Sequence, residues 1–302
     1  MPHSQPLSGK GVMLSVLASV LFALLSGYTT LLKPLDGLAI YAWRVLWTLP
    51  GVLLLVAVRG QWSSLRGQLA RLRSEPALWL ALPAMAALLA TQLWLFMWAP
   101  LHGQAMAVSM GYFLLPLTMV LTGCLLYGER LYRLQWLAVA CAMLGVAHEL
   151  WLTRAFAWPT LLVAIGYPPY FVLRRWSKLE PVSGFVLELA AMSPVALVLL
   201  WQLGEAGWGV LAEPRFWLLL PGLGLISTVA LVCYLVAGRL LPLGLLGILG
   251  YVEPVLLFVL AVTLLGEPLS ADSLLTYGPI WLAVLLTGVH TLLHQRGSLR
   301  AA

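Results

Sequence analysis

Gly111-Tyr112-Phe113-Leu114-Leu115-Pro116 and Gly250-Tyr251-Val252-Glu253-Pro254 place the same markers in two stretches of apolar sequence. Each stretch leads to a Gly-Glu-x-Leu motif, in which Glu129 and Glu267 stand thirteen positions after the respective proline. The copies fall in the fourth and ninth apolar segments, so the second lies five segments after the first. Because five is odd, a second copy that crosses a membrane has the opposite orientation to the first. Inverted repeats of this kind are typical of secondary transporters, which bind substrate where the repeats meet.

The composition predicts an integral membrane protein. The chain is 62% hydrophobic and 9% charged, whereas soluble domains have about 25% charged residues. Apolar runs of about 18 to 23 residues predict ten spans: 10–32, 37–58, 76–98, 103–126, 134–150, 157–173, 181–203, 216–236, 242–264 and 273–293. The predicted fold is all-α, with ten transmembrane helices in two inverted-topology repeats of five helices. The first repeat covers 10–150 and the second covers 157–293.

Loop charges predict the orientation. With the N-terminus inside, thirteen lysines and arginines fall in inner loops and three in outer loops. Cytoplasmic loops are the ones enriched in these residues. We therefore expect a multi-pass protein of the inner (plasma) membrane with both termini cytoplasmic. The net charge of +6 is then explained by topology and contact with anionic lipid, and no nucleic-acid partner is expected.

The inner loop 59–75 has the pattern of a surface helix. Apolar residues recur at helical spacing, at Trp62, Leu65, Leu69 and Leu72. Arginines recur every seven residues on another face, at Arg59, Arg66 and Arg73. This pattern predicts an amphipathic helix lying on the inner membrane surface as an anchor.

Glu253 is the first candidate for proton coupling. It lies near the middle of the ninth predicted span, directly before Pro254. Acidic residues inside a membrane are costly and usually functional. A proline at this position frees backbone carbonyls that need another partner. The alternative is a carboxyl group that only holds helices together.

Arg44 and Glu188 are a second pair of candidates, since each precedes a proline by six positions in equivalent spans. Glu188 is a further proton-coupling candidate, and Arg44 a candidate for binding an anionic substrate group. Their Cα depths in the membrane differ by roughly 9–10 Å at 1.5 Å per residue. A direct ion pair is therefore disfavoured, and either separate partners or a structural role in repeat packing would explain them.

Aromatic and amide side chains complete the predicted substrate site. Tyr112 and Tyr251 stand beside the repeated glycine in both copies. Gln92 and Trp94 lie near the end of the third span, where Trp is also common at the membrane interface. Together with Arg44, these residues are the predicted substrate contacts.

Prolines inside the spans predict helix breaks. Pro116 and Pro254 belong to the repeat, and Pro168 and Pro169 stand between two tyrosines in the sixth span. Breaks of this kind suit a hinge or a gate, although a proline in a membrane helix can also be a passive kink.

No catalytic residue, metal site or cofactor is predicted. His290 and His294 have the i, i+4 spacing of a metal pair, but no further ligand type is nearby. The three cysteines lie in spans without C-x-x-C spacing. Motifs for nucleotide binding or nucleophilic hydrolysis are missing from the sequence.

Several stretches resemble a known family, the RarD-type branch of the drug/metabolite transporter superfamily, whose members have two EamA domains of five helices. The resemblance covers nearly the whole chain and is most specific at Trp43-Arg44-Val45-Leu46-Trp47, Trp94-Leu95-Phe96-Met97-Trp98-Ala99, Ser109-Met110-Gly111-Tyr112, Gly128-Glu129-Arg130-Leu131 and Leu134-Gln135-Trp136. It implies ten helices around a central cavity with alternating access.

Some positions depart from that family's pattern. Trp43 stands where the family has histidine, Leu115 where it has asparagine, and Gly250 where it has glutamine. The family has glutamate near Ala107, and glycine where this chain has Glu253. We expect a more apolar cavity, in which one acidic group takes over polar recognition or proton coupling.

These patterns predict a secondary transporter that exports a small organic solute or drug-like metabolite, either proton-coupled or facilitative. The alternatives are a structural or sensory membrane protein, and a lipid-modifying membrane enzyme. The expected partners are the small-molecule substrate and membrane lipid. Small residues in the fifth span, Ala138, Ala142 and Gly145, allow close packing within the chain or in a homodimer.

Overall fold

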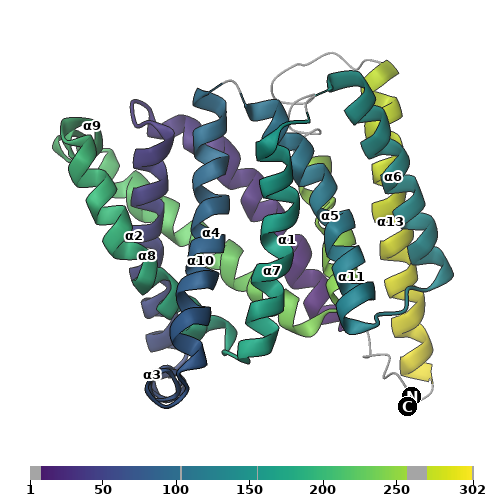
Figure 1. The fold of residues 1–302 in the computed structure, drawn as a ribbon, viewed down its shortest axis with the longest axis horizontal. Helices are drawn as coiled ribbons and strands as arrows, with labels where there is room; N and C mark the ends of the chain where they lie inside the picture. Colours follow the sequence, from purple (N-terminus) through teal and green to yellow (C-terminus); the bar gives the residue numbers. More distant parts are fainter. Residues whose placement is uncertain (1–7, 103, 155, 257–270, 301–302) are drawn as a thin grey trace. The chain divides into compact units, whose positions relative to one another are not determined.

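The computed structural model describes residues 8–102, 104–154, 156–256 and 271–300. In chain order its helices are α1 (Gly9–Tyr28), η1 (Thr29–Leu32), α2 (Gly37–Val58), α3 (Trp62–Ser74), α4 (Ala77–Leu101), α5 (Ala105–Tyr127) and α6 (Arg133–Thr153). They continue with α7 (Trp158–Ser177), α8 (Pro181–Leu203), α9 (Glu205–Trp208), η2 (Gly209–Ala212), α10 (Phe216–Leu240), α11 (Leu243–Leu249) and α13 (Ala271–Arg300) (Figure 1). The all-α prediction is confirmed for these residues.

Seven helices of the described part are long and apolar enough to cross a membrane. They are Gly9–Leu32, Gly37–Val58, Ala77–Phe96, Ala107–Tyr127, Arg133–Thr153, Pro181–Leu203 and Phe216–Leu240. The shorter apolar helices Leu243–Leu256 and Leu274–Val289 fall in the predicted ninth and tenth spans. The predicted sixth span falls in α7, which has two arginines in its last turn. The chain is thus a multi-pass membrane protein, while the total of ten spans remains a prediction.

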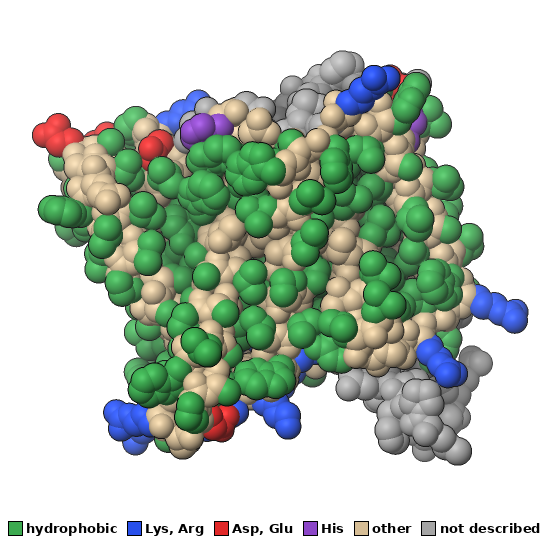
Figure 2. Space-filling view, viewed as in Figure 1, with side chains coloured by type: hydrophobic (Ala, Val, Ile, Leu, Met, Phe, Trp, Pro, Cys, Tyr) green, Lys and Arg blue, Asp and Glu red, His purple; other side chains and the backbone are tan. Residues whose placement is uncertain are grey.

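The surfaces of these helices suit lipid. Large apolar side chains are exposed along α6 (Leu137, Met143, Leu144, Trp151) and at the start of α10 (Trp217, Leu218). Figure 2 shows hydrophobic side chains over much of the helical surface. Because contiguous apolar patches of this extent are unusual on soluble monomers, the surrounding medium is the hydrocarbon core of a bilayer.

The chain forms two compact units, and each takes segments from both halves of the sequence. Unit 1 is Met1–Ala23, Met106–Pro168 and Ala237–Ala302. Unit 2 is Leu24–Ala105 and Pro169–Val236. The predicted repeats, 10–150 and 157–293, have different boundaries because they follow sequence similarity and not compactness. The repeat boundaries therefore remain a prediction.

Unit 1 is built around α6 and α13, which lie side by side (Figure 1). The small residues of α6 make this possible, since Ala138, Ala142 and Gly145 are all buried. A Cβ atom on Gly145 would lie 2.5 Å from the backbone oxygen of Thr276. These small residues thus have a packing partner within the same chain, and the homodimer remains a prediction.

Unit 2 is built around α2 and α8, with α4 packed on both and α3 against α8 and α4. Local sequence fixes where the two central helices begin. The Asp36 carboxylate accepts the backbone N–H of Ala39 at 2.7 Å, and the Glu180 carboxylate accepts that of Ser183 at 2.7 Å. Each carboxylate caps a helix start that would otherwise leave its N–H groups without partners.

The predicted helix breaks at Pro116, Pro168 and Pro169 are wrong, because α5 and α7 continue through these residues. A proline removes the N–H that would bond to the carbonyl four residues earlier. For Pro168 that carbonyl belongs to Ala164, which accepts a hydrogen bond from the Thr118 hydroxyl of α5. A neighbouring helix thus supplies the missing donor, so that α7 has no need to open.

The chain is interrupted close to Pro254, but not at the proline itself. Helix α11 ends at Leu249, Gly250 and Tyr251 form a turn, and helical backbone resumes at Val252. Pro254 therefore lies in the first turn of the resumed helix, where its missing N–H costs nothing. The second copies of the other markers, Gly266 and Glu267, lie outside the described residues.

The predicted helix within 59–75 is present as α3, Trp62–Ser74. One residue of its apolar stripe, Leu65, is buried against the rest of unit 2, whereas Trp62 and Leu69 are each 43% exposed. The helix is thus confirmed, and its position on the inner membrane surface remains a prediction.

Candidate functional site

The two copies of the repeated marker meet inside unit 1, where α11 packs against the middle of α5. A Cβ atom on Gly247 would lie 2.7 Å from both the Met119 Cβ and the backbone oxygen of Pro116. One on Gly250 would lie 3.7 Å from the Pro116 ring. Glycine at 247 is therefore required for this close approach, and the proline of the first copy lies against the segment that leads into the second.

Tyr251 makes a structural contact where α5 and α11 pack together, which we call the α5–α11 seam. Its side chain is fully buried, and its hydroxyl donates to the backbone oxygen of Phe113 at 2.9 Å. Phe113 stands three residues before Pro116, so the contact links the tyrosine of the second copy to the turn of α5 that precedes the proline of the first copy. Tyr112, the equivalent residue of the first copy, is half-buried on α5. The two predicted substrate contacts thus differ in accessibility.

Glu129 has a role that the sequence marks only as part of the repeat. Its two carboxylate oxygens accept the backbone N–H groups of Leu243 at 2.6 Å and Gly244 at 2.8 Å. These are the first two residues of α11, and the preceding Pro242 has no side-chain cap of its own. Glu129 therefore caps α11 from the loop that follows α5. The sequence did contain a signal for this contact: the residue before α11 is a proline, whose side chain cannot cap the helix, so the cap must come from another segment.

Replacing Glu129 with alanine should destabilise unit 1 by about 1–2 kcal/mol, because two N–H groups at the start of α11 lose a charged acceptor. Thermal denaturation in detergent, followed by size-exclusion chromatography, would measure the change. Glu213→Ala is the matched control, since its carboxylate is exposed and its ion-pair partner among the described residues is Arg215, a contact worth about 0–1 kcal/mol. Equal effects of the two variants would contradict the capping role.

Arg44 lies in a buried polar row of unit 2. Its side chain is 4% exposed, and its Nε donates to the Ser227 Oγ of α10 at 2.6 Å. The Thr48 hydroxyl donates to the Arg44 carbonyl at 2.5 Å, and the Thr228 hydroxyl donates to the Thr48 carbonyl at 3.2 Å. The row brings hydroxyl groups and one guanidinium group together between α2 and α10, an arrangement that can bind an anionic or hydrogen-bonding group.

Glu188 is part of a buried cluster with Arg174 and Tyr170. The carboxylate is fully buried and forms an ion pair with the Arg174 guanidinium group, which is 6% exposed. The Tyr170 hydroxyl donates to Glu188 at 3.0 Å, and Arg174 also donates to the carbonyl of Pro181 at 2.6 Å. Every oxygen of the carboxylate thus has a donor, as a buried charge requires.

Arg174 is one of the thirteen lysines and arginines that the loop-charge count assigns to inner loops, and this cluster corrects that assignment. The residue lies in the last turn of α7 and faces α8. The i, i+4 spacing of Tyr170 and Arg174, which places both on one helix face, was the signal for it. Arg44 donates to Ser227, whereas Glu188 pairs with Arg174, as expected if Arg44 and Glu188 have different partners.

The remaining predicted contacts are divided between the units. In unit 2, Gln92 is buried on α4, and the half-buried ring of Trp94 lies 5.5 Å from that of Trp98. Trp98 in turn stacks on His102 at 4.2 Å. In unit 1, Glu253 is half-buried in the first turn of the resumed helix. Tyr251 thus lies where α5 meets α11 in unit 1, and Arg44 lies in the buried polar row of unit 2. Each unit contains some of the predicted substrate contacts.

Trp43 shows what replaces the family's histidine. Its indole Nε1 donates to the Gly207 carbonyl at 2.9 Å, and its ring packs edge-on against Trp208 at 5.2 Å. The side chain is buried. At this position the chain therefore has a packing contact to α9 in place of an ionisable group.

A further polar contact joins α6 to α13 in unit 1. The Thr276 hydroxyl donates to Glu149 at 3.1 Å, and the His148 Nδ1 lies 2.8 Å from the same hydroxyl oxygen. Because the hydroxyl proton is directed to Glu149, Nδ1 must carry the proton that it shares with Thr276. Within the described part of the chain no group of three metal-ligand types is found, and the side chains of His290 and His294 lie outside it.

The lipid-facing helices and buried polar rows define an integral membrane protein of the multi-pass type. No protein-family model matches the chain. It is 54% identical over 93% of its length to the Pseudomonas aeruginosa "Chloramphenicol-sensitive protein RarD", covering 94% of that protein. It is 30% identical over 95% of its length to Escherichia coli "Protein RarD", covering 96% of it. The chain belongs to the RarD-type family of membrane transporters.

Two further comparisons concern a relative and the fold. A Pasteurella multocida protein, named only as an uncharacterized transporter, is 39% identical over 92% of the chain and is covered over 94% of its own length. A crystal structure of a protein matches with a TM-score of 0.68, covering 93% of this chain and 98% of the other, at 22% identity. At that identity the likeness shows the fold alone.

Proposed function

We propose that the chain has ten transmembrane helices in two inverted-topology repeats. The packing of equivalent helices supports this arrangement. The second and seventh predicted spans pack together as α2 and α8, and the fifth and tenth pack together as α6 and α13. The fourth and ninth meet where Gly247 of α11 lies against Pro116 of α5. Repeats related by an axis in the membrane plane bring equivalent helices together near that axis.

On this framework the protein is a secondary transporter that exports a small organic solute across the inner membrane. The relatives named as transporters support the class, and the name of the Pseudomonas aeruginosa relative makes amphenicols one solute class to test. Exposed arginines of α3 and exposed glutamates near α9 lie at opposite ends of unit 2 (Figure 2). That polarity supports a cytoplasmic α3. For both termini we keep the cytoplasmic side that the loop charges of the sequence predict.

The carboxyl group proposed for coupling is that of Glu253, with Arg44, Tyr112, Gln92 and Trp94 as the substrate contacts. Glu253 is half-buried beside the interruption at Gly250 and Tyr251. Backbone polar groups at such an interruption can contact a proton or cation more easily than those of a continuous helix. Glu188 is the weaker candidate, because its carboxylate already has an ion-pair partner and a tyrosine donor. Tyr251 shapes the seam through its contact with Phe113.

Proteoliposomes with a pH-sensitive dye inside test this proposal. Amino acids, aromatic metabolites and amphenicols are added in turn to vesicles that contain the wild type, Glu253→Gln or the control Glu205→Gln, which changes an exposed carboxylate of α9. We expect one solute class to drive a proton flux in the wild type and the control, and none in Glu253→Gln.

Other outcomes of this experiment would favour a different proton carrier, a different transport mechanism or a different function. An undiminished flux in Glu253→Gln rules out this residue as the proton carrier. Uptake of labelled solute without proton movement in the wild type indicates facilitated transport. If the folded protein moves no solute of the panel, the structural or sensory alternative is favoured over transport.

A further inference from the structure

Helix α3 has an apolar stripe that the protein covers only in part. Trp62, Leu65, Leu69 and Leu72 follow one another at helical spacing. Leu65 is buried in unit 2, but Trp62 and Leu69 are both 43% exposed. An amphipathic helix whose apolar side is half uncovered needs a further apolar partner.

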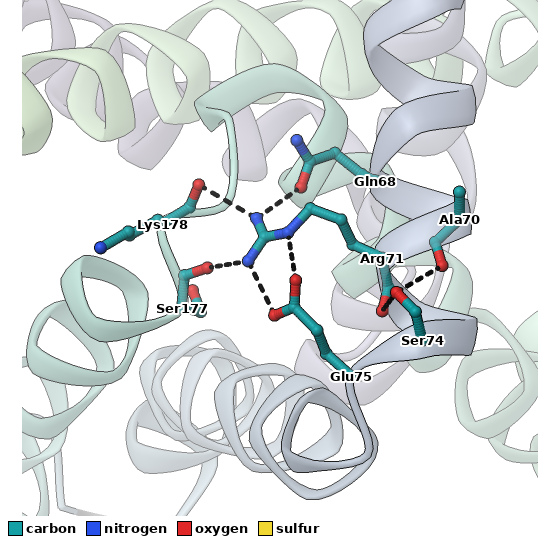
Figure 3. A network of polar contacts seen from close by, with 7 residues as sticks. All are labelled: Gln68, Ala70, Arg71, Ser74, Glu75, Ser177 and Lys178. Carbon is teal, nitrogen blue, oxygen red and sulfur yellow. Dashed lines mark hydrogen bonds and ion pairs between the residues drawn. The ribbon is translucent and has the colours of Figure 1, made fainter.

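Arg71 clamps α3 to the turn between α7 and α8 (Figure 3). Its guanidinium group donates to the carbonyls of Ser177 at 3.0 Å and Lys178 at 3.4 Å. It also donates to both carboxylate oxygens of Glu75, at 2.8 Å and 3.0 Å. The hydrogen bond from Arg71 lowers the pKa of Glu75, and the same bond raises the pKa of Arg71. The clamp thus fixes the helix and neutralises its own charge.

The carboxylates near α3 and the turn between α7 and α8 already have partners within the protein. Glu75 pairs with Arg71, Glu180 caps α8 at Ser183, and Glu188 pairs with Arg174 inside the protein. Four exposed cations remain, at Arg59, Arg66, Arg73 and Lys178, and no ion pair of the described residues involves them. Arg66 and Arg73 are two turns apart on one face of α3. The result is a fixed surface with a net positive charge.

Three exposed tryptophans lie among these cations. Trp62 begins α3, and Trp79, which is 65% exposed, donates its indole N–H to the Leu72 carbonyl of α3. Trp176, which is 57% exposed, stands next to the Ser177 carbonyl held by Arg71. Tryptophan rings favour the level of the lipid headgroups, with the apolar ring toward the acyl chains and the N–H toward polar groups. Cations and rings are thus interleaved on one surface.

We propose that this surface, the α3 platform of Arg59, Arg66, Arg73, Lys178, Trp62, Trp79 and Trp176, binds the headgroups of anionic phospholipids. The four cations contact lipid phosphates, and the tryptophans together with Leu69 contact the upper acyl chains. Free phosphate would satisfy the cations but leave the exposed rings without a partner. An amphiphile with a negative headgroup satisfies both.

Native mass spectrometry and thermal denaturation of the purified full-length chain in mild detergent test the proposal. Phosphatidylglycerol, phosphatidylcholine with the same acyl chains, or glycerol phosphate is added. We expect phosphatidylglycerol to remain bound and to raise the melting temperature, and the other two to have little effect. In Arg66→Gln/Arg73→Gln/Lys178→Gln, binding should weaken by about tenfold to a hundredfold, since each cation near an anionic surface strengthens binding by about fivefold.

The matched control is Lys10→Gln/Arg130→Gln/Arg133→Gln, which removes three exposed cations of unit 1 and should keep most of the phosphatidylglycerol effect. Equal losses in the two triple variants would overturn the proposal, because they would indicate general charge attraction. An equal response to glycerol phosphate or phosphatidylcholine would also overturn it. Both variants must first match the wild-type melting temperature without added lipid. If the platform variant does not, Trp62→Ala/Leu69→Ala is compared, and an unchanged lipid effect there contradicts the proposal.

Discussion

Replacing Arg174 with methionine is expected to lower the stability of the protein by about 3–5 kcal/mol, because it leaves the Glu188 carboxylate buried without its cation. Glu188 is fully buried, and the Tyr170 hydroxyl would be its one remaining side-chain donor among the contacts described. The Pro181 carbonyl would lose its donor as well. Denaturation with sodium dodecyl sulfate in mixed micelles measures the change in the free energy of unfolding.

The double variant Arg174→Met/Glu188→Leu is the control for this prediction. It removes both charges together, so that no uncompensated charge stays inside, and replacing a buried pair by apolar residues is often close to neutral. We expect it to recover most of the stability lost in Arg174→Met. If the double variant is as unstable as the single one, the loss comes from packing or from the Pro181 contact, and not from an isolated charge.

Gly224→Ala is expected to have the second large effect. A Cβ atom at this position of α10 would lie 2.5 Å from the carbonyl carbon of Trp47 and 2.6 Å from its Cβ. These are atoms on or next to the backbone of α2, so that the two helices would have to move apart. Overpacking costs typically about 1–3 kcal/mol, and here it also separates the polar row in which Thr228 and Ser227 meet α2.

Gly27→Ala provides the comparison within the same unit, because a Cβ atom there would have no neighbour within 4 Å. Alanine is the better helix former by about 1 kcal/mol, so this variant should be neutral or slightly stabilised. The melting temperatures of the two variants and the wild type, measured in the same detergent, test whether Gly224→Ala alone is destabilised. A wild-type melting temperature for Gly224→Ala would show that α2 and α10 do not approach as closely as described.

The helical part of the fold could be predicted from the sequence because long apolar runs and helical periodicity are local signals. The amphipathic pattern of 59–75 gave α3 to within a few residues. Its position against α8 and the turn after α7 could not be predicted, since it depends on the contacts of Arg71 with the carbonyls of Ser177 and Lys178. Nothing in the sequence near Arg71 marks those carbonyls as its partners.

The candidate site was harder to predict, because the sequence assigns residues to loops or to the protein interior by their residue type alone. Arg174 belongs to a group of basic residues that the orientation rule places in loops, yet its own side chain turns into the protein to meet Glu188. Tyr251 shares its repeat position with Tyr112, but only Tyr251 is buried, at a carbonyl near Pro116. The sequence overstated the breaks at Pro116 and Pro168, since α5 and α7 continue through these residues. For Pro168, α5 supplies a hydroxyl to the carbonyl that the proline leaves open.

The partnership of α6 with α13 has a consequence for biosynthesis. The end of α6 at Thr153 and the start of α13 at Ala271 are separated by more than a hundred residues. At roughly 5–20 residues per second, a ribosome needs on the order of ten seconds to make that stretch. During this time His148, Glu149 and the groove at Gly145 have no Thr276 to meet. The nascent chain therefore presents a polar helix edge to the insertion machinery until its final segment arrives.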